Sequence, residues 1–431
     1  MSGTSGQKSK GRRRLRMGFS TGTAMTAAAK AATRCLLSGV SPRSVAVRLP
    51  VGYYLPVDVA CCAGHGDWAE AVVIKDGGDD PDVTHKARVC VRLWLAPPPT
   101  GRGTDPAAVG SDWIRLTAGV GVGRVTKSGL PVAAGEPAVN PVPRRMLAEN
   151  LFEELERVPD LAVERTVAGG PGEGRPGKAA VWLPVPESAV KNPVASIHVE
   201  VSVPRGEELA RHTLNPRLGV VGGISILGTT GLVKPFSHQA YEETIQVALD
   251  VARANGCAQV VFSTGGKSEK LARALLNGLP AESFVQIADF FSFAVKRAVG
   301  AGFRSIVHSV FFGKAVKMAQ GNPYTHAHKV ALDLNTVARW AAGEGVPHEA
   351  LERIRGANTA RHALEILKGF SGLEGAPFQD ACQRNVSPAY RVVRRIAQEA
   401  VRQSKAMAGP EVAVRLLLFD FDGTLLADVT A

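Results

Sequence analysis

The residues of this chain best suited to bind a ligand fall in four short loops of its second half, each directly after a predicted strand. The loops cover residues 228–231, 263–266, 286–289 and 308–314. Glycine in a loop lets backbone N–H groups approach a ligand, and the start of a following helix favours anionic oxygens. Each loop alone is more typical of a tight turn. Because parallel strands bind ligands at their carboxyl ends, the four loops together predict a ligand site.

An acidic segment at residues 76–85 carries four carboxylates within seven residues and ends in His85. Carboxylate clusters suit a hard cation, but the spacing differs from that of a calcium loop. Aspartate and glycine are also common in turns. The sequence therefore leaves three roles for this segment: a structural turn, a polar or catalytic site, or a metal site.

A glycine-rich stretch at residues 119–127 presents Arg124 and Lys127, and Arg144 and Arg145 extend this basic region. Arginine can bind a carboxylate through two hydrogen bonds, so the stretch suits an acidic ligand. Its continuation is not helical, which excludes a dinucleotide-binding fingerprint. The glycine loops in the second half match neither that fingerprint nor a phosphate-binding P-loop.

Two further motifs carry residue types used in catalysis. His326 and His328 follow a predicted helix at 313–319, and histidine is the usual general acid or base near neutral pH. His326 is the stronger candidate, with a structural role as the alternative. Residues 420–424 look like the opening motif of an aspartyl-phosphatase, but only seven residues follow Thr424, so we interpret them as a strand and a turn.

The elements that position these residues differ between the two halves of the chain. An alanine-rich helix is predicted at 24–37, with Thr21 or Thr23 as its N-cap and Gly39 at its end. Strand-like runs follow it, at 44–49, 55–61, 69–75, 87–95 and 113–116.

After about residue 215 a strand–loop–helix pattern recurs, which is typical of a parallel α/β sheet. The expected strands cover 218–227, 259–262, 284–287 and 304–311, and helices are expected at 239–255, 267–276, 289–299 and 313–319. We therefore predict an α/β chain with an α+β N-terminal part and a parallel α/β C-terminal part. Its expected segments are a disordered basic tail at 1–16, a strand-rich domain at 17–214, a ligand-binding domain at 215–345, and helices with a terminal strand at 346–431.

Composition narrows the class of protein. Lysine and arginine number 51 against 39 acidic residues, a net charge of +12, and half of this excess lies in residues 1–16. The remaining excess favours anionic ligands without requiring nucleic acid, and the sparse aromatic residues (6%) argue against a base-stacking platform. Six cysteines without a C-x-x-C pair indicate neither a disulfide framework nor a zinc site. With no secretory signal and no membrane span in view, we expect a cytoplasmic protein.

Taken together, these segments resemble the CbiD family, the cobalt-precorrin-5B C-methyltransferases of anaerobic cobalamin biosynthesis. The resemblance is carried by GFSTGTA (18–24), KDGGDDPDVTH (75–85) and long ordered blocks at 121–146, 215–237, 260–270, 284–298 and 313–326. It implies transfer of a methyl group from S-adenosylmethionine to ring carbon 1 of the cobalt-containing macrocycle. It also implies a fold particular to this family, unlike the two-lobed fold of most other methyltransferases of the pathway.

The resemblance directs the assignment of site residues. The proton acceptor is expected among His326, Asp289 and Asp82. The methyl donor is expected across Gly228, Thr229, Thr230 and Gly231 and across Ser263, Thr264, Gly265 and Gly266. The substrate carboxylates are expected on Thr21, Thr23, Arg124, Lys127, Arg144, Arg145, Arg217 and Lys314. No metal ligand from the protein is expected, because cobalt arrives within the substrate.

Other functions remain open at this point. The chain could be a non-catalytic tetrapyrrole carrier, a methyltransferase acting on a cobalt-free precorrin, or a nucleic-acid-binding protein that uses its basic tail. The sequence leaves the oligomeric state open.

Overall fold

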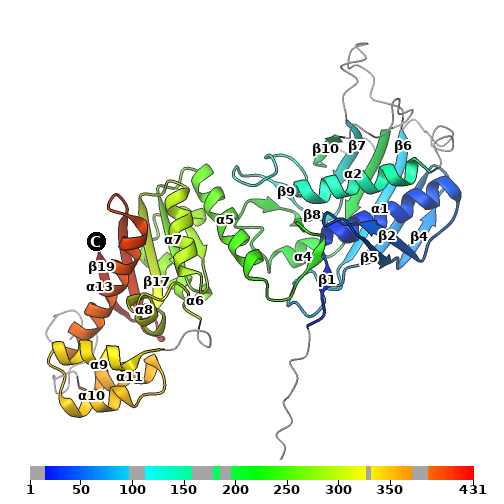
Figure 1. Cartoon of the computed structure of the whole chain (residues 1–431). Helices are drawn as coiled ribbons and strands as arrows, with labels where there is room; N and C mark the ends of the chain where they lie inside the picture. Colours follow the sequence, from blue (N-terminus) through cyan, green and yellow to red (C-terminus); the bar gives the residue numbers. More distant parts are fainter. Residues whose placement is uncertain (1–14, 97–111, 158–177, 185–195, 327–331, 371–386) are drawn as a thin grey trace, which may run out of the picture. The chain divides into compact units, whose positions relative to one another are not determined.

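The computed structural model describes residues 15–96, 112–157, 178–184, 196–326, 332–370 and 387–431. The chain forms two compact units, Met1–Ser237 and His238–Ala431 (Figure 1). Most of the basic tail and His328 lie outside the described residues.

The first unit is built around a six-stranded, mainly antiparallel sheet of order β10-β7-β11-β6-β5-β4. Only β11 and β7 pair in parallel among these strands. The sheet strands are β4 (Cys61–Gly64), β5 (Trp68–Ile74), β6 (Arg88–Ala96), β7 (Asp112–Ala118), β10 (Ala180–Pro184) and β11 (Ser196–Ser202). The strands β2 (Ser44–Arg48) and β3 (Tyr54–Asp58) form a separate antiparallel pair.

Helix α1 (Thr21–Ser38) packs on β5 and β6 and beside α2 (Pro141–Leu155) (Figure 1). Its alanines are small enough to be enclosed on every side, and all but two of its residues are buried. Ser20 is the N-cap, since its hydroxyl accepts a hydrogen bond from the backbone N–H of Thr23, so the expected cap at Thr21 or Thr23 was wrong. Gly39 ends the helix in the left-handed conformation, as predicted.

Short strands complete the first unit where one expected strand would have run from 218 to 227. Gly219 and Gly222 have positive φ angles there, so the backbone breaks into two short strands. These two-residue strands pair as follows: β12 (Val220–Val221) with β9 (Arg124–Val125), β13 (Gly223–Ile224) with β8 (Gly121–Val122), and β14 (Leu232–Val233) with β1 (Gly18–Phe19). The five-residue helix α4 (Gly206–Ala210) contacts β13 and β8.

The second unit contains the predicted parallel sheet, with strand order β16-β15-β17-β18-β19. The strands β15 (Gln259–Ser263), β16 (Phe284–Gln286), β17 (Ser305–Phe311) and β18 (Ala413–Phe419) are parallel, and β19 (Leu425–Thr430) closes the sheet in the antiparallel direction. The fourth parallel strand is thus β18 rather than 218–227. Residues 420–424 form the turn between β18 and β19, as we interpreted them.

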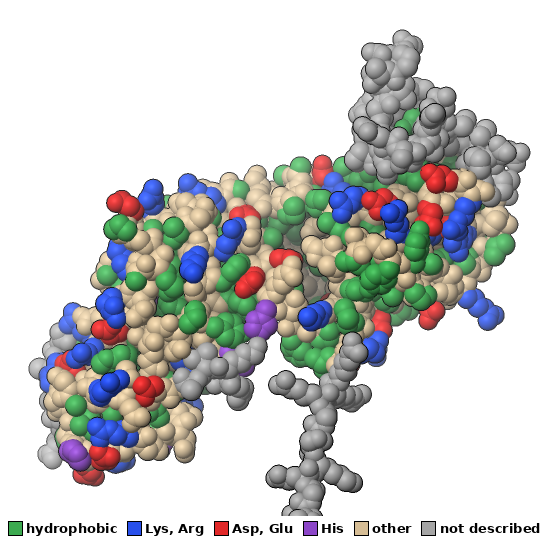
Figure 2. All heavy atoms as spheres, viewed as in Figure 1, with side chains coloured by type: hydrophobic (Ala, Val, Ile, Leu, Met, Phe, Trp, Pro, Cys, Tyr) green, Lys and Arg blue, Asp and Glu red, His purple; other side chains and the backbone are tan. Residues whose placement is uncertain are grey.

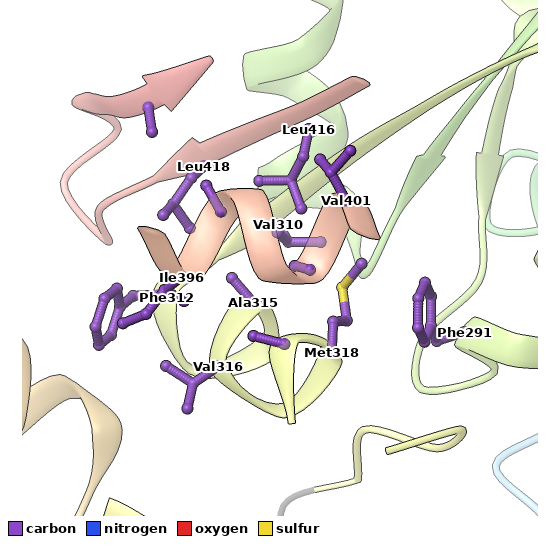
Figure 3. Packing of buried hydrophobic residues seen from close by; sticks show 14 of the residues in the cluster. Phe291, Val310, Phe312, Ala315, Val316, Met318, Ile396, Val401, Leu416 and Leu418 are labelled. Atoms are coloured by element: carbon purple, nitrogen blue, oxygen red, sulfur yellow. The ribbon is translucent and has the colours of Figure 1, made fainter. Parts of the chain in front are cut away.

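Helices cover both faces of this sheet. Helix α6 (Gly266–Leu275) packs on one face, and its side chains meet Val261, Val307 and Leu417. The other face is covered by α5 (His238–Ala254), α7 (Phe291–Gly300), α8 (Phe312–Ala319) and α13 (Pro388–Ala408). Figure 3 shows Leu416 and Leu418 of β18 beside Ile396 and Val401 of α13.

Three further helices complete the second unit (Figure 1). They are α9 (Leu334–Gly343), α10 (His348–Arg355) and α11 (Ala360–Gly369), and a 3-10 turn at Ala281–Ser283 precedes β16. Helix α9 packs against α13, α11 packs against α8, and α10 packs against both α9 and α11. In the described ranges, none of the helices combines the length and hydropathy needed to cross a membrane.

Candidate active site

The start of helix α1 is joined to the glycine loop at 228–231. The Thr21 hydroxyl donates to the Leu227 carbonyl oxygen (3.2 Å) and accepts from the Leu227 N–H (3.0 Å). The Thr23 hydroxyl donates to the Gly231 carbonyl oxygen at 2.6 Å. Both threonines are buried, so their hydroxyls hold the loop against the helix. The structure thus brings together two segments that are about 200 residues apart in the sequence and were both expected at the site.

The acidic segment lies against strand β1. The Phe19 N–H donates to the Asp76 carbonyl oxygen (2.8 Å), and the Asp76 carboxylate pairs with Arg16. The Arg16 guanidinium, through hydrogen bonding, lowers the pKa of Asp76 to about 2. The segment is therefore fixed to β1 through its backbone and to the preceding Arg16 through the Asp76 side chain.

Asp82 is held by the buried lysine that directly precedes this segment. Its carboxylate forms an ion pair with Lys75, whose side chain is 2% exposed, and accepts hydrogen bonds from Thr84. Burial by itself raises the pKa of Asp82, but the Lys75 ammonium and Thr84 outweigh burial, so the pKa lies below its usual value. Asp82 is thus a stable carboxylate that neutralises Lys75.

The basic candidates of the first unit fall into two groups. Arg144 donates to the carbonyl oxygens of Val139 (2.6 Å) and Pro137 (3.2 Å) and pairs with Glu136. Its guanidinium therefore stabilises the protein itself. Arg145, by contrast, is an exposed side chain on α2.

The other basic candidates lie along the pairing of β9 with β12. Arg124 is exposed on β9 and opposite Val221, and the Thr126 N–H donates to the Gly219 carbonyl oxygen at 2.8 Å. The Lys127 side chain lies beside Gly219. Gly219 is two residues after Arg217 in the sequence, so Lys127 and Arg217 are close to each other. The structure thus gathers Arg124, Lys127 and Arg217 in one region. On the face drawn in Figure 2, basic side chains are interspersed with acidic ones rather than forming one continuous patch.

The loop at 263–266 follows the strand of the second unit where the strand order reverses. From β15 the chain continues to β16 on one side and then to β17 on the other side, and ligands bind at such a reversal in open α/β sheets. The Thr264 N–H donates to the Ser268 hydroxyl (3.2 Å), and that hydroxyl donates to the Gly265 carbonyl oxygen (3.0 Å). A Cβ on Gly265 would find no heavy atom within 4 Å, so this loop borders open space.

Asp289 follows β16 at the same edge of the sheet. Its Oδ1 atom accepts hydrogen bonds from the Lys314 ammonium and from the Thr325 hydroxyl (3.2 Å), and its carbonyl oxygen accepts one from the Thr325 N–H (3.0 Å). The preceding Ala288 has a φ of 43°, a left-handed conformation that is costly for a non-glycine residue. Surrounding contacts therefore hold Asp289 in a fixed orientation.

Lys314 links the candidate residues of this edge. Its ammonium also donates to the Thr325 carbonyl oxygen at 3.1 Å. Burial and the neighbouring Lys317 lower the pKa of Lys314 to about 8, so it is still largely protonated at neutral pH.

His326 directly follows Thr325, so it lies beside this cluster. The Lys317 ammonium donates to the His326 carbonyl oxygen at 2.8 Å, and the His326 ring stacks on Tyr324 with a centroid distance of 6.0 Å. The second unit therefore brings together three residues that were expected at the site from separate loops, Asp289, Lys314 and His326.

Sequence reasoning missed Thr325, Lys317 and an aromatic group beside Asp289. In that group Phe290 contacts Tyr241 (5.1 Å between centroids) and Tyr324 (5.2 Å). Two signals in the sequence could have indicated these residues: Phe290 directly follows Asp289, and Thr325 directly precedes His326. Within the described ranges, no group of three or more His, Cys, Asp or Glu side chains could hold a metal ion.

Comparison with known proteins gives one consistent family. Residues 8–177 and 174–235 match the family model described as CbiD, and residues 324–430 match the model described as CbiD, C-terminal domain. The Cobalt-precorrin-5B C(1)-methyltransferase of Nitratidesulfovibrio vulgaris is 41% identical over 96% of this chain and 92% of that relative. The protein of the same name from Salinispora arenicola is 39% identical over 91% of this chain and 90% of that relative.

A solved structure is also similar, the cobalamin biosynthesis protein (cbiD) from Archaeoglobus fulgidus. It is 23% identical, with a TM-score of 0.33, and the match covers 70% of this chain and 79% of that one. The family matches span both units, and the relatives are aligned over nearly their whole length. The chain therefore belongs to the CbiD family.

Proposed function

We propose that this chain transfers a methyl group from S-adenosylmethionine to ring carbon 1 of cobalt-precorrin-5B, which gives cobalt-precorrin-6A. The observation that carries this proposal is the 41% identity, over 96% of the chain, to a relative named Cobalt-precorrin-5B C(1)-methyltransferase. The methyl donor is a sulfonium and supplies an already activated methyl group. The main task of the protein is therefore to align donor sulfur, methyl group and ring carbon.

The loop at 263–266 is the better candidate for the methyl donor. Gly265 borders open space, and the backbone N–H groups at the start of the ten-residue helix α6 suit a carboxylate such as that of the donor. In the other expected loop, a Cβ on Gly228 would overlap Ser20, and one on Gly231 would lie 2.7 Å from Leu49. That tight packing favours a structural role for residues 228–231.

The carboxylates of the macrocycle require cations that a ligand can reach from the surface. Arg124 and Arg145 are exposed, and Lys127 and Arg217 are half-buried near Arg124. Arginine suits this role because its planar guanidinium matches a carboxylate. Arg144 is bound to main-chain carbonyl oxygens and Lys314 to Asp289, so we give them supporting roles.

We assign proton transfer with the macrocycle to His326. Histidine changes its charge close to neutral pH, and this ring lies beside the Asp289 cluster. Asp289 and Asp82 are the alternatives. Each carboxylate is paired with a lysine ammonium, which favours its charged form and therefore makes it a weaker proton acceptor.

The test is an anaerobic incubation of the full chain with both compounds, followed by mass spectrometry. The expected product is heavier than the substrate by one CH₂, with S-adenosylhomocysteine formed in equal amount. Binding of the macrocycle without product would instead indicate a tetrapyrrole carrier. A parallel incubation with the cobalt-free precorrin would reveal whether the enzyme requires cobalt in its substrate.

The assignment of the proton acceptor is tested separately by single-turnover rates at saturating methyl donor. We expect His326→Ala to lose most of the rate, because general acid–base catalysis typically contributes about 100-fold or more. If His326→Ala and Asp289→Asn both keep the full rate, neither residue is the proton acceptor.

A further inference from the structure

We propose that Asp289 binds the ribose hydroxyl groups of the methyl donor rather than acting as a base. This inference rests on the proposed function, because it assumes that the donor is a nucleoside. It assigns a ligand role to one atom, Oδ2 of the Asp289 carboxylate, which accepts no side-chain hydrogen bond from the residues that the structure describes.

The order of the strands supports this assignment. Strands β15, β16 and β17 lie in the order β16-β15-β17, so the chain reverses direction across the sheet at β15. In doubly wound sheets the loop after the first strand approaches the ligand, and an acidic residue roughly 20 residues further on binds the ribose. Here the loop at 263–266 follows β15, and Asp289 follows β16, the next strand in the chain.

The loop at 263–266 and the end of β16 are neighbours in space. Ser263 is in register with Gln286 across the β15–β16 pair. A Cβ on Gly266 would meet the Gln286 side-chain nitrogen at 4.0 Å as its nearest neighbour. A ligand seated over the open Gly265 would therefore extend toward the segment that carries Asp289.

The incomplete glycine motif also fits this donor. The complete dinucleotide fingerprint provides a close backbone approach to a pyrophosphate. S-adenosylmethionine carries no phosphate, so the loop needs only to accommodate the amino-acid part and the sugar. The ribose hydroxyls are hydrogen-bond donors and require an acceptor such as a carboxylate.

The Asp289 carboxylate has one oxygen available for this purpose. Both of its side-chain hydrogen bonds in the described chain end on Oδ1, one from Lys314 and one from Thr325. The side chain is 16% exposed, so the carboxylate is partly accessible to a ligand without being fully hydrated. Lys314 and Thr325 thus orient the carboxylate, and Oδ2 can accept a ligand hydroxyl.

The test measures the equilibrium binding of three probes by calorimetry, without catalysis. The probes are S-adenosylhomocysteine and its 2′-deoxy and 3′-deoxy analogues, each added to the full chain. The wild-type protein should bind at least one deoxy analogue about 10- to 100-fold more weakly, because a hydrogen bond to a charged group is lost. Asp289→Asn should bind S-adenosylhomocysteine more weakly by a similar factor and should no longer distinguish it from that analogue.

Asp428→Asn is the matched control. Asp428 is also a carboxylate paired with a cation, Arg415, but it lies on β19 away from the strand reversal. This variant should keep both the affinity and the discrimination of the wild-type protein. The comparison of the three probes on the wild-type protein needs no variant, so the test holds even if Asp289→Asn does not fold.

Two results would overturn the assignment while leaving the proposed function intact. One is a wild-type protein that methylates its substrate but binds all three probes equally. The other is an Asp289→Asn variant that keeps the wild-type discrimination yet turns over slowly, which would make Asp289 a proton acceptor. If the wild-type protein binds none of the probes and forms no methylated product, the proposed function fails together with this inference.

Discussion

Replacing Gly265 with valine should block the methyl donor without unfolding the protein. A Cβ at Gly265 meets no protein atom within 4 Å, and the φ of 171° is extended backbone that any residue adopts. Valine is a poorer N-cap than glycine by up to about 1 kcal/mol. Valine also restricts the unfolded chain more than glycine does, which raises the free energy of unfolding by about 0.4–1 kcal/mol. The free energy of unfolding should therefore change by less than about 1 kcal/mol.

The effect of Gly265→Val on binding should be much larger. An isopropyl group in the open space would push the ligand away from the N–H groups of α6, and one lost hydrogen bond to a charged group corresponds to about 1.5–3 kcal/mol. We expect the affinity for S-adenosylhomocysteine to fall about 10- to 100-fold in calorimetry.

Gly278→Val provides the comparison for Gly265→Val. A Cβ on Gly278 also meets no atom within 4 Å, and this glycine lies on the loop after α6. The Gly278→Val variant should bind S-adenosylhomocysteine with the same affinity as the wild-type protein. A folded Gly265→Val that binds S-adenosylhomocysteine normally would refute the placement of the methyl donor at residues 263–266.

Three further predictions concern stability and substrate binding. Gly18→Ala should lower the free energy of unfolding by about 1–3 kcal/mol in urea titrations, because the new Cβ would lie 2.3 Å from the Asp76 carbonyl oxygen. Burial lowers the pKa of His308 to about 3, so below about pH 6.5 the unfolded chain binds a proton that the folded chain does not. The free energy of unfolding should therefore fall by about 1.4 kcal/mol per pH unit as the pH drops from 6.5 toward 3. The opening free energy of β17, obtained from hydrogen exchange after correction for the intrinsic exchange rate, should depend less on pH in His308→Asn. Arg124→Ala should raise KM for the macrocycle several-fold with little change in the melting temperature, since its side chain is exposed; an unchanged KM would remove Arg124 from the substrate site.

Sequence periodicity predicted the second unit well because its elements are regular. Helices α5 to α8 and strands β15 to β17 lie within about two residues of the expected bounds, which is the usual uncertainty of element ends. Strand β19 was missed because its short run is stabilised by pairing with β18. That tertiary contact leaves little trace in local sequence.

The first unit was harder to predict where glycine sets the backbone. The apolar run at 218–227 has the composition of a strand, yet its left-handed glycines divide it. Helix α2 was also missed, although Asn140 followed by Pro141 is a typical helix start. At the candidate site, the sequence singled out Asp289 and Lys314 as candidates but did not indicate that they pair, because a contact between loops depends on the assembled sheet.

The enclosure of α1 bears on how the protein can move. A helix whose alanines pack tightly on every side has no room to shift or rotate, because well-packed interiors have few voids. Local opening is easiest where few apolar side chains are buried. Any rearrangement of the first unit during turnover should therefore occur in its exposed segments, which bury few apolar side chains, while helix α1 keeps its position.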